Sequence, residues 1–453
     1  MERLRALTFH EILIIEGGTI SCTRPRRFCA RRLLVAIAML LLQHAQAYSV
    51  LSHEAVVDSL WDDRIRPLLL SRFPNTSPEQ LRAAHGYAYG GAIIQDMGYY
   101  PYGSHFFSDL THYVRSGDFV VNLINESHDV NEFAFALGAL SHYVSDDVGH
   151  PLGTNKVVPL LYPKLRKKYG DVITFEDDPV AHVQTEFGFD VLEVAKGRFA
   201  EPEYHNFIGF EVARPVLERA FRDTYSLELT DIFDDLDRTI GSYRRAVSKT
   251  IPLATKIAWA HREDEITKTQ PGITRDRFLY NLSRSSYEKE WGTKYERPGL
   301  GDRFLAFILK LIPKIGPLRS LTLRLPDAQG EQLFMKSFNI SLNRFRTTLD
   351  SVHQGKLKQL PDTNFDVGLP TKPASYKLAD KTYAEFLHRL AKKNFRGLDE
   401  PVRSKILSYY SDTSLPFATK NNEKEWRRVL SELRELKATG SLVSHSVAHN
   451  SVR

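Results

Sequence analysis

The segment from Phe133 to Pro151 places three polar side chains in a strongly apolar helical stretch. His142, Asp146 and His150 follow one another at intervals of four residues, so on a helix they project from one face, about 6 Å apart. Polar and charged side chains in such surroundings need a partner, because burying an isolated charge is costly. Asp147 is an alternative to Asp146, but only Asp146 shares a face with both histidines.

A second helix repeats this pattern. Asp178-Pro179 is typical of a helix start, and the helix predicted from there toward Gly197 carries His182 and Glu186 at the same interval. Two side chains four residues apart can chelate one metal ion without backbone strain, and zinc accepts imidazole nitrogen and carboxylate oxygen readily. One such pair is usually an ordinary helix contact, whereas two helices that each carry one favour a metal site.

Further candidate ligands lie nearer the N-terminus. His53, Asp96 and His112 each also have a structural interpretation: His53 as a capping or surface residue, and Asp96 as the start of a turn. His105 competes with His112 as a ligand, and the spacing from Asp96 favours His112. One metal cluster would explain the whole set.

Helix signals dominate elsewhere, and the fold class is predicted to be all-α. Ser77-Pro78 predicts a capped helix start before the apolar run Leu81 to Ile94. Asn131 is expected to cap the helix that Gly149 ends, and another helix is predicted from near Thr230 into the 250s. Convincing alternating strand patterns are scarce.

The first 47 residues have the pattern of a secretory signal peptide. Arg31 and Arg32 precede an apolar run from Leu33 to Leu42, and Ala45-Gln46-Ala47 follows. The run is too short to span a bilayer, although an uncleaved membrane anchor is the alternative. Cleavage after Ala47 would make Tyr48 the N-terminus of a secreted or periplasmic protein.

The leader also accounts for two features of the composition. Both cysteines, Cys22 and Cys29, lie in it, so the mature chain has no disulfide or thiolate ligand and any metal site must use histidine, carboxylate and backbone groups. The formal net charge of +6 falls to about +2 without the leader. This balance provides no strong nucleic-acid signature.

The remaining chain divides by composition. We expect an all-α domain that carries the candidate ligands at 48–260, an irregular basic connecting region at 261–330, a helical C-terminal region at 331–437 and a disordered tail at 438–453. Phe304 to Leu318 is apolar with interleaved lysines. It is predicted to be a core-packing helix, with peripheral membrane contact as the alternative.

The ordered set of candidate ligands resembles the metal-ligand pattern of the zinc-dependent phospholipase C and P1/S1 nuclease superfamily. The local sequence around His142 and His150 is similar to that of its bacterial phospholipase C/D branch. The resemblance covers roughly 48–250. The chain departs from the family in having Tyr48 where relatives carry Trp, and a shorter spacing from Asp146 to His150.

The resemblance implies three zinc ions. The first would be held by Asp96, His112, His142 and Asp146, and the second by His150, His182 and Glu186. The third would take His53, Asp146 as a bridge, and the backbone amino and carbonyl groups of Tyr48. Asp96 is the candidate catalytic residue that orients the attacking water or accepts its proton.

The resemblance further implies a phosphoric ester hydrolase, in which clustered zinc ions generate a metal-bound hydroxide that attacks phosphorus. Phospholipid cleavage of the phospholipase C type is the favoured reaction. A single-strand nuclease of the P1/S1 type or a phosphatase is one alternative, and Tyr99, Tyr100, Tyr102 and Phe106 are candidates for the aromatic slot that a nuclease needs. A non-catalytic binding protein whose helices are stapled by zinc is the other.

Overall fold

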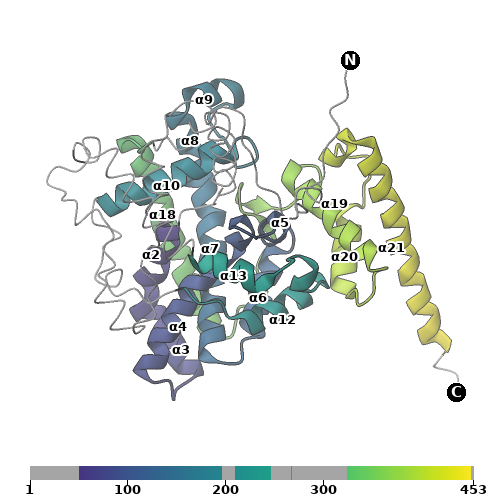
Figure 1. The fold of residues 1–453 in the computed structure, drawn as a ribbon, viewed down its shortest axis with the longest axis horizontal. Helices are drawn as coiled ribbons and strands as arrows, with labels where there is room; N and C mark the ends of the chain where they lie inside the picture. Colours follow the sequence, from purple (N-terminus) through teal and green to yellow (C-terminus); the bar gives the residue numbers. More distant parts are fainter. Residues whose placement is uncertain (1–49, 196–209, 246–266, 268–323, 450–453) are drawn as a thin grey trace, which may run out of the picture. The chain divides into compact units, whose positions relative to one another are not determined.

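Helices make up nearly all of the regular structure (Figure 1). The computed structural model describes residues 50–195, 210–245, 267 and 324–449. In that part of the chain the only strands, β1 (Thr363–Asn364) and β2 (Leu369–Pro370), form an antiparallel hairpin with Thr363 opposite Pro370. The all-α fold class is confirmed.

The helices follow one another with short connections. Up to residue 195 they are α2 (Val50–Leu60), η1 (Trp61–Ile65), α3 (Arg66–Arg72), α4 (Pro78–Gly91), η2 (Ile94–Tyr99), α5 (His105–Tyr113), α6 (Ser116–Asn125), α7 (Val130–Gly149), η3 (His150–Thr154), α8 (Asn155–Leu161), α9 (Pro163–Tyr169) and α10 (Pro179–Ala195). Beyond residue 210 they are α12 (Arg214–Tyr225), η4 (Leu229–Asp231), α13 (Leu236–Arg245), α18 (Ala328–His353), α19 (Lys377–Lys392), α20 (Glu400–Tyr409), η8 (Ala418–Asn421) and α21 (Glu423–His449).

Of the four predicted helix starts, those at Ser77 and Asp178 are confirmed. The Ser77 side chain accepts a hydrogen bond from the Gln80 amide at 3.2 Å and completes a capping box. Asp178 caps α10 by accepting from the Ala181 amide at 2.9 Å. The prediction that Asn131 caps α7 is wrong: Asp129 accepts from the Asn131 and Glu132 amides, because it precedes the helical residues.

Helix α7 ends at Gly149 as predicted, but the chain does not leave the helical path there. Residues His150–Thr154 continue α7 as a single π-helical turn. Pro151 lies at the start of this turn, where a missing N–H group is tolerated. The chain therefore stays helical through His150, which sets the direction of that side chain.

Two other boundaries differ from expectation. The helix predicted from Thr230 begins at Leu236, because Asp235 caps it through the Arg238 amide at 2.9 Å. The backbone of α21 is helical through His449, where a disordered tail from residue 438 was predicted. The amphipathic run that starts at Glu423 continues without a helix breaker other than Gly440.

Several predictions concern residues outside the described ranges. The signal peptide at 1–47, the N-terminal Tyr48, the segment Phe304 to Leu318 and nearly all of the connecting region 261–330 lie there. Of the helices that the structure describes, none combines the length and apolar character needed to cross a membrane.

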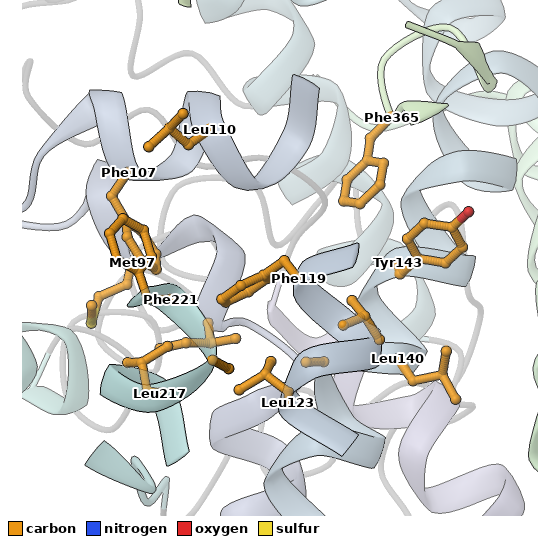
Figure 2. Packing of buried hydrophobic residues seen from close by; sticks show 14 of the residues in the cluster. Met97, Phe107, Leu110, Phe119, Leu123, Leu140, Tyr143, Leu217, Phe221 and Phe365 are labelled. Carbon is orange, nitrogen blue, oxygen red and sulfur yellow. The ribbon is translucent and has the colours of Figure 1, made fainter. Parts of the chain in front are cut away.

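Helix α7 lies at the centre of the packing and contacts α2, α3, α4, α6 and α18. Figure 2 shows part of the apolar core, in which Leu140 and Tyr143 of α7 lie beside Phe119 and Leu123 of α6. Phe365, from the hairpin in the C-terminal region, packs edge-on against Tyr143 at a centroid distance of 5.3 Å (Figure 2). The C-terminal region thus contributes directly to this core.

Glycines allow α4 and α7 to approach until their backbones touch. A β-carbon on Gly138 would lie 2.0 Å from the Ala88 carbonyl oxygen, and one on Gly91 would lie 1.9 Å from that of Phe135. This approach brings the Ala92 carbonyl oxygen within 2.9 Å of Nδ1 of His142. The packing of the two helices therefore orients one of the predicted ligands.

Substituting Gly138→Ala is expected to destabilise the fold by roughly 3 kcal/mol or more, since the new methyl group meets backbone atoms that cannot move alone. Gly241→Ala is the matched control, because a β-carbon there meets nothing within 4 Å. It should raise stability by about 1 kcal/mol through helix propensity. Chemical denaturation followed by circular dichroism measures both, and equal stability of the two variants would contradict the close-packing account.

Candidate metal centre

Eight predicted ligands come together in the interior. They form three groups in which the potential ligand atoms lie within 4.8 Å of one another: His53, His142 and Asp146; Asp96, His112 and His142; and His150, His182 and Glu186. Each side chain is at most 2% exposed. Such a set of buried imidazoles and carboxylates matches the ligand chemistry of zinc.

Five helical segments and one 3-10 turn supply these residues. His53 comes from α2, Asp96 from η2, His112 from α5, His142 and Asp146 from α7, His150 from the π-helical turn η3, and His182 and Glu186 from α10. Helices hold side chains in narrow rotamer ranges. The site is therefore built on rigid elements far apart in the sequence.

Asp146 is the common neighbour of four imidazoles. Its Oδ2 lies 3.0 Å from Nε2 of His142 and 3.6 Å from Nε2 of His112. Its Oδ1 lies 3.4 Å from Nε2 of His53 and 3.8 Å from Nε2 of His150. The two carboxylate oxygens thus face different imidazoles, as a bridging carboxylate must.

The third group consists of His150, His182 and Glu186. Its Nε2 is 3.2 Å from Oε1 of Glu186, and Nε2 of His182 is 2.9 Å from the same oxygen. The two imidazole rings stand nearly perpendicular, with centroids 5.0 Å apart. The π-helical turn therefore places His150 between Asp146 and Glu186, beside a residue with which it is predicted to share a zinc ion.

Backbone carbonyls fix which nitrogen of two histidines carries the proton. Nδ1 of His142 donates to Ala92 O at 2.9 Å, and Nδ1 of His112 donates to Ser108 O at 2.8 Å. In the neutral rings Nε2 then has a lone pair, and this lone pair faces carboxylate oxygens, including Oδ1 of Asp96 at 3.4 Å. Such an arrangement is repulsive unless a proton on Nε2 or a cation lies between the partners.

Buried polar atoms without hydrogen-bond partners converge on the same place. Among the described residues these include Nε2 of His112, His142 and His182 and both carboxylate oxygens of Asp96, Asp146 and Glu186. Buried polar groups are normally hydrogen-bonded, and clustered exceptions call for an ion. The residues present therefore fit a bound metal cation.

Electrostatics within the set push the pKa values in opposite directions. Burial lowers the pKa of His112, but the carboxylates of Asp146 and Asp96 outweigh burial and raise it to about 10. Burial lowers the pKa of His53, and the neighbouring His142 lowers it further. Burial raises the pKa of Asp146, but His142 and His150 hold it well below its usual value. Without a metal ion, the carboxylate of Asp146 is therefore ionised and the imidazole of His112 is protonated.

The two alternative ligands, His105 and Asp147, lie outside the three groups. His105 is exposed at the start of α5, whereas His112 is buried beside Asp96. Asp147 forms an ion pair with Arg344 of α18 and belongs to none of the three groups. The backbone of Tyr48, predicted to bind the third zinc ion, lies outside the described residues.

The sequence reasoning missed two residues of the C-terminal region that border the set. Oδ1 of Asp366 lies 3.4 Å from Nδ1 of His150, and the ring of Phe365 lies 5.1 Å from that of His112. Burial raises the pKa of Asp366, but the neighbouring His150 holds it below its ordinary value. Both residues lie in a Pro-rich stretch far along the chain from the helices that carry the ligands. No rule of sequence spacing connects such a stretch to those helices.

The comparison with known families agrees with this geometry. Residues 52–235 match the family model described as zinc dependent phospholipase C. The matched segment contains all eight clustered side chains. No curated protein and no solved structure matches the chain.

Asp146→Asn is expected to lower the zinc content of the purified protein by at least one ion per chain, because Asp146 is the common neighbour of four imidazoles. Asp147→Asn, at the next position of α7, is the matched control. It breaks the ion pair with Arg344 but leaves the three groups intact. Elemental analysis after desalting measures the content, and equal zinc in both variants would contradict the central role of Asp146.

Zinc binding to the metal-free protein is expected to release protons at pH 7.5. The pKa of His112 near 10 keeps Nε2 protonated there, and zinc needs its lone pair. The apparent zinc affinity should therefore rise with pH up to about 10, by about tenfold per unit for each proton displaced. Calorimetric titrations in buffers of different ionisation enthalpy count the protons; a count of zero would contradict this charge assignment.

Proposed function

Because the segment 52–235 belongs to the zinc-dependent phospholipase C family, we propose that the chain is a zinc-dependent phosphodiesterase that cleaves phospholipids at the glycerol side of the phosphate. The observation that supports this most directly is the buried set of eight imidazoles and carboxylates in three groups. A structural zinc site is closed by four ligands. Eight side chains exceed that need, which favours a multinuclear catalytic site over a zinc staple.

The proposed ligand sets follow the three groups. Asp96, His112, His142 and Asp146 would hold one zinc ion, and His150, His182 and Glu186 a second. His53 and Asp146 would hold a third, together with the backbone of Tyr48 if cleavage after Ala47 makes it the N-terminus. The second set offers three protein ligands, the number typical of an open catalytic position.

Zinc ions bound there would act as Lewis acids on the phosphoryl oxygens and lower the pKa of water toward ~7. Asp96 is proposed to orient the attacking water and accept its proton. Asp96 is proposed for this role because its buried carboxylate lies at the edge of the set, 3.4 Å from Nε2 of His112. Exclusion of bulk water from the buried set strengthens each of these interactions.

The nuclease alternative receives less support from the aromatic residues. Tyr99, Tyr100 and Phe106 are buried, and Tyr100 packs edge-on against Tyr243 at a centroid distance of 5.0 Å. Tyr102 is exposed, but the guanidinium of Arg238 covers its ring at 3.7 Å. These four side chains are engaged in packing rather than forming a slot for a base.

The leader pattern at 1–47 supports a proposal of export. Cleavage would place the enzyme outside the cytoplasm, where lipid surfaces are accessible. The exposed N-terminal amine would then be available as a ligand.

A substrate panel tests the proposed reaction. The mature chain beginning at Tyr48, loaded with zinc, is incubated with phosphatidylcholine vesicles, single-stranded DNA and a phosphate monoester. We expect diacylglycerol and phosphocholine to be released from the vesicles fastest. His182→Ala and Asp96→Asn should lower this rate by at least about 100-fold, whereas His128→Ala, at an exposed position outside the set, should not.

Faster release of nucleotides from DNA would assign the chain to the nuclease alternative. Turnover of none of the three substrates by protein with a full zinc complement would favour the non-catalytic alternative. Either result would overturn the phospholipase proposal.

A further inference from the structure

Asp366 is a buried carboxylate that the C-terminal region brings into contact with the candidate metal centre. It lies in the turn between β1 and β2 and is 2% exposed. Its Oδ2 accepts hydrogen bonds from the hydroxyl groups of Tyr113, at 2.8 Å, and Tyr376. Its Oδ1 faces Nδ1 of His150 at 3.4 Å. One oxygen is thus held by two tyrosines while the other faces an imidazole.

Hydrogen bonds at Asp366 and before it anchor the hairpin to the helices around the centre. The amide of Phe365 donates to His112 O at 3.3 Å, and Nδ2 of Asn155 donates to Asp366 O at 2.6 Å. Ser116 is hydrogen-bonded to both backbone groups of Thr363. These contacts fix the backbone position from which the carboxylate projects.

The hairpin also approaches α7 closely after Asp366. Gly368 has a φ of +64°, and a β-carbon there would lie 2.5 Å from Asp147 O. Only glycine fits this combination of left-handed backbone and contact with α7. The hairpin therefore lies directly on the end of the helix that carries His142 and Asp146.

The two ring nitrogens of His150 face different carboxylates. Nε2 faces Glu186 at 3.2 Å, on the side of the proposed ligand set, and Nδ1 faces Asp366. Asp366 is a member of none of the three groups of potential ligand atoms. It lies on the Nδ1 side of the imidazole. A carboxylate there can accept a hydrogen bond from the Nδ1–H group and leave the lone pair of Nε2 for a metal ion.

We propose that Asp366 is a positioning residue for His150, so that the C-terminal region completes a zinc site whose ligands all come from residues 52–235. This inference rests on the proposed function in one respect, the assignment of His150 as a zinc ligand. A carboxylate partner fixes the tautomer and ring orientation of a ligating histidine and raises its basicity, and losing it typically weakens metal binding by 10–100-fold. Residues 261–453 thereby acquire a role that the family segment does not supply.

Asp380 provides a matched control within the same region. It is also a buried carboxylate with a tyrosine partner, accepting from the Tyr409 hydroxyl at 2.6 Å and from the amides of Ala374 and Ala418. None of these hydrogen bonds within the described part of the chain reaches a predicted ligand. Loss of Asp380 should therefore affect folding alone.

The experiment compares four forms of the full mature chain: wild type, Asp366→Ala, Asp366→Asn and Asp380→Asn. Each is stripped of metal and titrated with zinc against a fluorescent chelator of known affinity, and thermal unfolding is recorded by circular dichroism. We expect Asp366→Ala to weaken one zinc site by 10–100-fold. The zinc affinity of Asp366→Asn should lie between those of Asp366→Ala and wild type, because the amide oxygen of the new side chain still accepts a hydrogen bond from Nδ1. Asp380→Asn should unfold at a lower temperature with unchanged zinc affinities.

Wild-type zinc affinities in both Asp366 variants would overturn the inference and leave the proposed function standing. Equal losses in Asp366→Asn and Asp380→Asn would also overturn it, because the effect would then be a general consequence of destabilisation. Absence of zinc binding by the wild type would instead overturn the proposed function, and this inference with it.

Discussion

The Asp146 carboxylate, enclosed by the Nε2 atoms of four histidines, is the interaction on which the rest of the structure depends. A buried carboxylate is costly unless its charge is balanced. Here it lies 3.0–3.8 Å from imidazoles of α2, α5, α7 and the π-helical turn η3. The elements that surround α7 are therefore also the elements that hold its counter-charges. Folding of this part of the chain and assembly of the candidate metal centre are one process.

Two kinds of contact make this assembly possible. Gly91 and Gly138 let α4 and α7 meet at backbone distance, which brings Ala92 O to Nδ1 of His142. The hairpin at 363–370 lies on the other end of α7, with Gly368 against Asp147 and Phe365 against Tyr143 (Figure 2). The close contacts of α4 and the hairpin with α7 thus fix the orientation of imidazoles that could otherwise adopt several tautomers and rotamers.

The parts of the site that were predictable from the sequence are those with local periodicity. His142, Asp146 and His150, and likewise His182 and Glu186, share a helix face because helical geometry brings residues four apart together, and the structure keeps them so. The π-helical turn at His150–Thr154 was not predictable, because Gly149 and Pro151 are ordinary helix-ending signals. Asp366 was not predictable either, since its contact with His150 depends on the tertiary path of a hairpin rather than on spacing.

X-ray diffraction from crystals of the zinc-loaded mature chain, recorded on both sides of the zinc absorption edge, tests the central claim most directly. The account predicts more than one anomalous peak within ligand distance of the eight side chains, with the two oxygens of Asp146 bound to different ions. A single peak would contradict the multinuclear site. The absence of any peak, with imidazoles hydrogen-bonded directly to the carboxylates, would make the set a buried ion-pair network, and the case for a metal-dependent hydrolase would fall with it.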